Sequence, residues 1–238
     1  MGGDGVPPLQ IIRDCRYHQR METPINLEEW FGGIDIYLFD QLLKGRFAPW
    51  MRVLDAGCGS GRNLVYFLRS GYEVFGVDES EAAIAKTRQL AASLQPQLPP
   101  ENFRVEPVEK MSFGNDARPV LQIANTQDTG FDLVLSSAVL HFARDEQHWQ
   151  AMVNEMWRVL KPGGIFFARL ASTIGIENQI RLIEGRRYHL PDGSDRFLVD
   201  QAMLQRVTAA LAGDFLEPIK TTVVENMRAM TTWVLKKQ

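Results

Sequence analysis

Three glycines at alternating positions, Gly57, Gly59 and Gly61, constrain this chain more than any other feature. They follow a short apolar run, and such a run ending in glycines is typical of a buried parallel strand followed by a tight turn. Glycine is needed where the backbone takes a positive φ or passes within contact of a ligand, because a Cβ would collide there. The apolar spacing over 62–68 predicts a helix that directs its positive end toward the turn. We therefore predict a site for a nucleoside-bearing ligand, with a purely structural turn as the alternative.

The spacing of these glycines separates two classes of ligand. The dinucleotide-binding fingerprint is G-x-G-x-x-G, whereas this chain has G-x-G-x-G preceded by Asp55. A carboxylate here would repel a pyrophosphate, yet it suits a ligand that carries an ammonium group. The stretch 53–61 resembles the glycine-rich motif of the class I, Rossmann-like S-adenosylmethionine-dependent methyltransferases, in which the acidic residue lies near the methionine part of the cofactor. An NAD-dependent oxidoreductase is a disfavoured alternative.

A second acidic residue, Asp78, ends the next predicted strand. It follows the glycine turn by roughly 20 residues, where nucleotide-binding α/β units place a carboxylate on the ribose hydroxyls. The alternative role for Asp78 is to cap the helix that is predicted to begin after Ser80.

The phrase V-L-K-P-G-G at 159–164, followed by an apolar run, strengthens the resemblance. With the glycine turn and Asp78, in this order over residues 52–170, it identifies the chain as a member of the class I methyltransferases, among small bacterial enzymes. The resemblance implies an α/β fold with a Rossmann-like, mostly parallel sheet of seven strands in the order 3-2-1-4-5-7-6. It also implies helices on both faces, an N-terminal helical extension, and S-adenosyl-L-methionine as the cofactor.

Two parts of the chain are expected. Residues 1–48 form a tail and a helical lid, and residues 49–238 form the methyltransferase domain. Within that domain the periodic pattern lapses over 171–196, which we expect to be an insertion that covers the substrate because it leaves the carboxyl end of a strand.

Periodicity and capping residues predict the remaining elements. Helices are expected from Asn26 to Gly32 and over 34–43, 81–94, 146–160 and 200–211, with a short one at 120–124. Strands are expected at 103–108, 131–137, 165–170, 215–225 and 228–236.

The resemblance also implies a set of cofactor-binding residues at the carboxyl edge of the sheet. These are Asp55, Ala56, Gly57, Gly59, Gly61, Asn63, Asp78, Glu79, Val108, Glu109, Met111, Ser136 and Ser137. Pro107 stands where family members often place an aspartate for the adenine amino group, so Val108, Glu109 and Met111 are expected to frame the ring instead.

Catalytic and substrate residues are harder to assign. His141 is a candidate general base because it titrates near neutral pH in the loop beside the transferred methyl group; packing against the cofactor is the alternative. Trp30 and Tyr37 of the extension and Arg181 and Tyr188 of the insertion are candidate substrate residues. The arginines of the insertion either pair with an anionic substrate or form a solvated face.

Composition excludes several other classes of protein. A net charge of -3 and a pI near 5.9 make a nucleic-acid partner unlikely, and no N-P-P-Y or D-P-P-Y tetrapeptide for base methylation is present. The chain has no apolar run that could span a bilayer and begins with no signal peptide, so we expect a cytoplasmic protein without a membrane partner. The positions of Cys15 and Cys58 predict no metal site.

Together these observations predict methyl transfer from S-adenosylmethionine to a small-molecule acceptor, by a monomer or homodimer. A non-catalytic regulatory protein that binds S-adenosylmethionine or S-adenosylhomocysteine would carry the same carboxylates, and only turnover separates the two. The sequence assigns no role to residues 114–130 and does not identify the acceptor.

Overall fold

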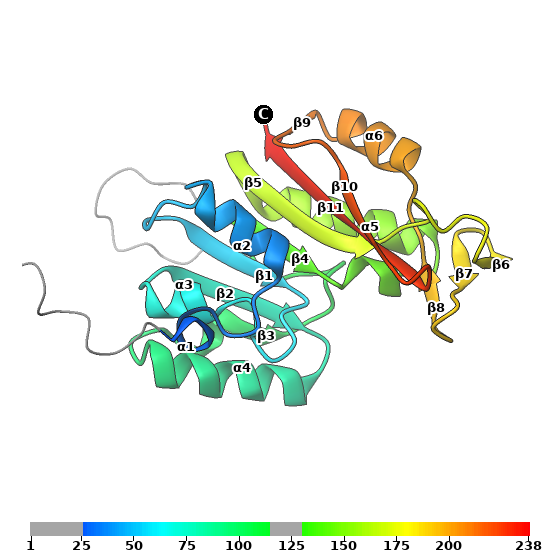
Figure 1. Ribbon diagram of the computed structural model, residues 1–238. Coiled ribbons are helices and arrows are strands. Elements are labelled where there is room, and N and C mark those ends of the chain that lie inside the picture. Colours follow the sequence, from blue (N-terminus) through cyan, green and yellow to red (C-terminus); the bar gives the residue numbers. More distant parts are fainter. Residues whose placement is uncertain (1–25, 115–129) are drawn as a thin grey trace, which may run out of the picture.

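The fold is taken from a computed structural model, which describes residues 26–114 and 130–238. The short helix expected at 120–124 and the tail before residue 26 lie outside these ranges. Figure 1 shows the described part as one large twisted sheet with helices packed on its two faces. In these ranges no helix combines the length and the apolar character needed to cross a membrane.

The large sheet follows the order β10-β11-β5-β4-β1-β2-β3, with a short strand β9 also paired to β11. The strands are β1 Arg52–Ala56, β2 Glu73–Asp78, β3 Phe103–Val105, β4 Phe131–Ser137, β5 Leu160–Ala171, β9 Gly213–Phe215, β10 Lys220–Val224 and β11 Arg228–Lys237. The first five are parallel, and β11 runs antiparallel to β5 and β10. With β10 and β11 as the sixth and seventh predicted strands, this path follows the predicted order 3-2-1-4-5-7-6, but the sheet has eight strands instead of seven because β9 also pairs with β11.

The added strand comes from a break in one predicted strand. Residues 215–225 were expected to be continuous, but they form β9 and β10, both paired with β11. Pro218 lies between them and has no backbone N–H to donate to the ladder. The hairpin from β10 to β11 turns where predicted, with positive φ at Glu225 and Asn226.

Helices cover the two faces of the sheet in two groups. The described α-helices are α1 Leu27–Phe31, α2 Ile36–Leu43, α3 Val65–Arg69, α4 Glu81–Leu94, α5 Glu146–Val159 and α6 Gln201–Ala210. Val53 of β1 packs into a core with α2, α3 and α4, whereas its neighbour Leu54 packs into a core with α5 and α6. This alternation follows from the twofold period of side chains along a strand.

The N-terminal extension is helical, as predicted, and its helices begin at side-chain caps. Asn26 Oδ1 accepts the N–H of Glu29 at 3.2 Å, and Asp35 Oδ1 accepts the N–H of Tyr37 at 2.9 Å. Gly32, with a φ of 57°, ends α1.

Three further elements differ in extent from the prediction. The helix expected over 62–68 begins only at Val65, because 62–64 remain in the turn that follows the glycines. The third strand ends at Val105, before Pro107. β5 begins at Leu160, so that 161–164 bulge out between the pairs Leu160 with Phe131 and Ile165 with Leu133.

The insertion contains regular strands, although the sequence shows no periodic pattern over 171–196. It contains β6 Arg181–Glu184 and β7 Arg187–His189, which form a small antiparallel sheet with β8 Asp195–Phe197. The turns between these strands use Gly185 and Gly193, both with positive φ. All four residues of β6 are exposed, so they carry no alternation that the sequence pattern could reveal.

Candidate active site

The glycine-rich turn is held rigidly at the carboxyl end of β1. The N–H groups of Gly57 and Cys58 both donate to Val77 O, at 2.8 and 2.9 Å, and Thr87 Oγ1 of α4 donates to Gly59 O at 2.8 Å. All three glycines have positive φ, which glycine adopts at no steric cost.

Each glycine of the turn has its own reason to lack a side chain. A Cβ on Gly57 would lie 2.4 Å from Val139 Cγ2, and one on Gly61 would lie 2.9 Å from Leu90 Cδ2. At Gly59 nothing lies within 4 Å, so this glycine opens onto empty space. The turn thus packs against the protein at its two ends and presents bare backbone in the middle.

Asp78 faces this turn from the end of β2. Its Oδ2 accepts the N–H of Gly59 and its Oδ1 accepts the N–H of Ser80, both at 2.9 Å. Ser80 itself caps α4 through Ala83 N, so Asp78 supports the helix start without being its cap. Because each carboxylate oxygen has further lone pairs, Asp78 is fixed in place and can still accept two hydroxyl groups.

Asp55 lies beneath the turn and is 1% exposed. Neither of its carboxylate oxygens has a hydrogen-bond partner among the described residues. Burial, opposed by the charge of Arg62 and reinforced by that of Asp78, raises the pKa of Asp55 to about 7. A buried acid without partners favours a cation nearby, which is the property expected of a residue near the ammonium end of the predicted cofactor.

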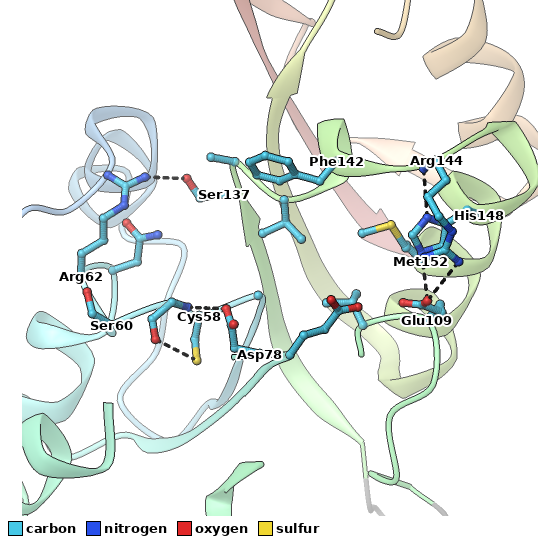
Figure 2. Close-up of a pocket in the computed structure, with 17 residues that line it drawn as sticks. Cys58, Ser60, Arg62, Asp78, Glu109, Ser137, Phe142, Arg144, His148 and Met152 are labelled. Atoms are coloured by element: carbon cyan, nitrogen blue, oxygen red, sulfur yellow. Dashed lines mark hydrogen bonds and ion pairs between the residues drawn. The ribbon is translucent and has the colours of Figure 1, made fainter. Parts of the chain in front are cut away.

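A cavity of about 540 Å³ opens over the turn (Figure 2). Of the predicted cofactor residues, those lining it are Gly57, Gly59, Asn63, Asp78, Glu79, Val108, Glu109 and Ser137. The others do not line it: Asp55, Ala56, Gly61, Met111 and Ser136, of which the four non-glycines are at most 2% exposed.

The start of α5 and the segment before it add a wall to the cavity that was not predicted from the sequence. Arg144, His148 and Met152 line the cavity from this side, and Figure 2 shows them grouped around Glu109. His148 Nε2 lies 3.0 Å and Arg144 Nη2 lies 3.7 Å from Glu109 Oε1. His148 and Met152 lie four residues apart and so share one face of α5, whereas Arg144 lies before the helix. The other lining residues not predicted are Cys58, Ser60, Arg62, Ala138, Val139 and Phe142.

The N-terminal extension is attached to the cavity through Asn63. Asn63 is 4% exposed, and its Oδ1 accepts the backbone N–H of Asp35 at 3.0 Å. Asp35 Oδ2 in turn accepts the Ser137 hydroxyl at 3.3 Å. The start of α2 is therefore bonded to residues on two sides of the cavity.

A second cavity of about 440 Å³ adjoins the first, and Arg62 and Ala138 line both. Its walls come from the start of α2, from β5 and β11, and from the insertion, which contributes Leu190, Asp192, Ser194 and Arg196. A molecule here would therefore lie next to the contents of the first cavity.

His141 lines this second cavity and is 8% exposed. Burial, aided by the charge of Arg196, lowers its pKa to about 4. Its Nδ1 has no hydrogen-bond partner among the described residues. At neutral pH the imidazole is therefore uncharged and only weakly basic.

The four predicted substrate residues lie elsewhere. Trp30, in α1, is 45% exposed, and Tyr37 shares a hydroxyl hydrogen bond with Thr222 of β10. Arg181 is exposed on β6, and Tyr188 of β7 packs against Leu190 and its apolar neighbours. None of the four lines either cavity.

Among the described residues no group of three or more His, Cys, Asp or Glu side chains is arranged to hold a metal ion. Cys58 is buried, and burial raises the pKa of its thiol far above the usual range.

The methyltransferase-domain family matches residues 54–168, the span from β1 to β5. An uncharacterized methyltransferase of Synechocystis is 32% identical over 119 residues, which are 50% of this chain and 46% of that protein. The malonyl-[acyl-carrier protein] O-methyltransferase of Enterobacter lignolyticus is 28% identical over 81% of this chain and 66% of its own length. The match thus spans between about half and two thirds of these relatives.

Solved structures share the fold at low identity. The PH0226 protein of Pyrococcus horikoshii superposes with a TM-score of 0.63 at 21% identity, covering 85% of this chain and 89% of its own. The 1,6-didemethyltoxoflavin-N1-methyltransferase of Burkholderia thailandensis was solved with bound 1,6-didemethyltoxoflavin and S-adenosylhomocysteine. It superposes with a TM-score of 0.61 at 18% identity, covering 90% of this chain and 81% of its own. Residues 54–168 therefore belong to the methyltransferase-domain family, and the chain shares the Rossmann-like fold of methyltransferases of known structure.

Proposed function

We propose that this protein transfers the methyl group of S-adenosylmethionine to a small-molecule nucleophile, with the donor in the first cavity and the acceptor in the second. The observation that carries the proposal is the adjacency of the two cavities, which share Arg62 and Ala138. A regulatory protein that only binds the cofactor has no need of a second cavity beside the first. The geometry therefore favours an enzyme over the non-catalytic alternative.

The first cavity and the buried residue beneath its turn fit the cofactor in three respects. Asp78 has lone pairs directed away from the two N–H groups that hold it, as required for the ribose hydroxyls. The space at Gly59 lets the ligand approach the backbone closely. The unpartnered carboxylate of Asp55 lies under the turn, where it favours the ammonium group.

The protein supplies positioning and exclusion of water. S-adenosylmethionine, when bound, would supply a methyl carbon that its sulfonium activates toward displacement by the lone pair of the acceptor, with the sulfur as leaving group. Such an in-line displacement gains much of its rate from orientation and desolvation, which the two adjoining cavities provide. Ser137 and Ala138, which have small side chains, line the first cavity, and Ala138 lines the second as well.

Calorimetric titration with S-adenosylhomocysteine tests the donor site. We expect saturable binding that Asp78→Asn weakens by at least about tenfold, because charge-assisted hydrogen bonds are lost. Asp214→Asn, a matched change of an exposed residue on β9, should leave the affinity unchanged.

Two results would contradict the proposal in different ways. If the folded wild-type protein does not bind S-adenosylhomocysteine at about millimolar concentration, the first cavity is not a donor site. Binding without formation of S-adenosylhomocysteine from S-adenosylmethionine, across a broad set of acceptors, would favour the regulatory alternative.

A further inference from the structure

We propose that the second cavity recognises its methyl acceptor by a negative charge, so that the acceptor is a small organic anion held by Arg228 and Arg196. This inference rests on the proposed function, since the second cavity is an acceptor site only if the first binds the donor. The volume of about 440 Å³ suits a small molecule.

The charges that line the cavity do not balance. Arg62, Arg169, Arg196 and Arg228 face only two carboxylates, Asp35 and Asp192. Because the low pKa of His141 keeps it uncharged at neutral pH, it does not alter the excess of positive charge. A cavity lined in this way attracts anions.

The two aspartates are already engaged within the protein. Asp35 accepts hydrogen bonds from Tyr37 N and Ser137 Oγ and lies 3.4 Å from Arg169 Nη1. Asp192 accepts the N–H and the hydroxyl of Ser194, at 3.0 and 2.6 Å, within the turn from β7 to β8. Their lone pairs are thus partly committed to holding α2 and the turn in place.

Arg228 is the arginine most available to a ligand. It begins β11 and is exposed, and its side chain has no hydrogen bond or ion pair with any residue of the described ranges. Its charge is felt at Asp192, whose pKa is lowered mainly by hydrogen bonds from Ser194 and further by Arg196 and Arg228. Because Arg228 and Arg196 both line the second cavity, the two can act together on one bound group.

Two of the other guanidinium groups lie on aromatic rings. The Cζ of Arg196 is 4.9 Å from the centroid of Phe142, and that of Arg169 is 4.6 Å from the centroid of Tyr37. Arg196 Nη1 donates to Asp195 O at 2.8 Å and Arg169 Nη1 lies near Asp35, but the remaining N–H groups of Arg196 can match the oxygens of a carboxylate or phosphate. The rings hold the groups in position before any ligand binds.

The groups near His141 also suit an acceptor that needs no strong base. With a pKa of about 4, the imidazole is a poor proton acceptor at neutral pH, and Asp35 already accepts several hydrogen bonds. A neutral alcohol would need a stronger base than these, whereas an anion can carry its own nucleophilic electron pair.

The test uses matched acids and amides on the full chain saturated with S-adenosylhomocysteine. Acetate, benzoate and 2-naphthoate are titrated beside their amides, which have nearly the same shape but no charge, and phenyl phosphate is compared with benzoate. We expect at least one acid to bind about tenfold or more tightly than its amide. Arg228→Gln should remove that preference, while Arg206→Gln, which deletes a positive charge from the exposed side of α6, should retain it.

The outcomes separate this inference from the proposed function. Affinity for S-adenosylhomocysteine is measured first in the wild type and both variants, and its absence would defeat the proposed function itself. If that affinity is normal but every amide binds as well as its acid, or no acid binds at about 20 mM, the anionic acceptor is excluded. An equal preference for acids in Arg228→Gln would overturn the role of Arg228. Tighter binding of phenyl phosphate than of benzoate would assign the anion as a phosphate.

Discussion

At the scale of single residues, the burial of Asp55 makes a prediction about pH. The folded protein holds the Asp55 proton with a pKa of about 7, against 3.8 for an unperturbed side chain. Between these two pH values the folded protein therefore holds a proton that the unfolded protein has released. The free energy of unfolding falls as the pH rises from about 4 to about 7. We expect Asp55→Asn to remove this loss, so that the free energy of unfolding of the variant gains about 4 kcal/mol on the wild type between about pH 4 and pH 8.

Urea unfolding at several pH values measures this difference. The matched variant Asp214→Asn alters an exposed carboxylate and should follow the wild-type profile. Parallel stability profiles for the wild type and Asp55→Asn would show that Asp55 ionises at its ordinary pKa.

At the scale of elements, Glu217 joins α2 to the segment between β9 and β10. Burial alone would raise its pKa, but hydrogen bonds from Lys220, Lys44 and Gln41 outweigh this and lower it to about 2. Gln41 Nε2 and Lys44 Nζ lie 2.8 and 2.7 Å from its Oε1. We expect Glu217→Gln to lower the free energy of unfolding by about 1 kcal/mol at neutral pH.

The direction of the pH dependence identifies the cause of this loss. A lowered pKa gives stability that is present above the unfolded value of 4.5 and is lost as the pH falls toward about 2. The deficit of Glu217→Gln should therefore shrink in acid, whereas Glu184→Gln on the exposed β6 should show no deficit at any pH. A deficit that is constant with pH would mean that packing, and not charge, explains it.

The same scale shows what the sequence can predict and what it cannot. The central strands of the large sheet were predictable because they are buried apolar runs, whereas the order of the strands came from the resemblance to the methyltransferase family. The insertion was not, because β6 is exposed throughout and its partners have three residues each. Gly57 and Asp78 were predicted as site residues because backbone conformation and charge limit what can stand there. His148 and Met152 were missed because the apolar period of α5 does not show which side chains at its edge reach the cavity.

At the scale of the whole molecule, we expect the N-terminal extension to respond to the donor. Asn63 lines the first cavity and accepts the N–H of Asp35, so a ligand that orders Asn63 also stabilises the start of α2. In hydrogen exchange with S-adenosylhomocysteine we expect slower exchange in the glycine turn and in 35–43. The exposed hairpin of β6 and β7 serves as the internal control and should exchange at an unchanged rate. Unchanged exchange in α2, together with protection of the turn, would mean that the extension is not a lid.

The alternation of β11 has a consequence for how acceptor preference can change over evolution or in engineering. Arg228 and Met230 line the second cavity, while Ala229 and Thr231 between and after them are fully buried. One strand thus offers two positions open to variation, separated by positions that the core holds constant. New acceptors could be explored by substituting Arg228 and Met230, while the buried Ala229 and Thr231 are left unchanged to maintain the scaffold.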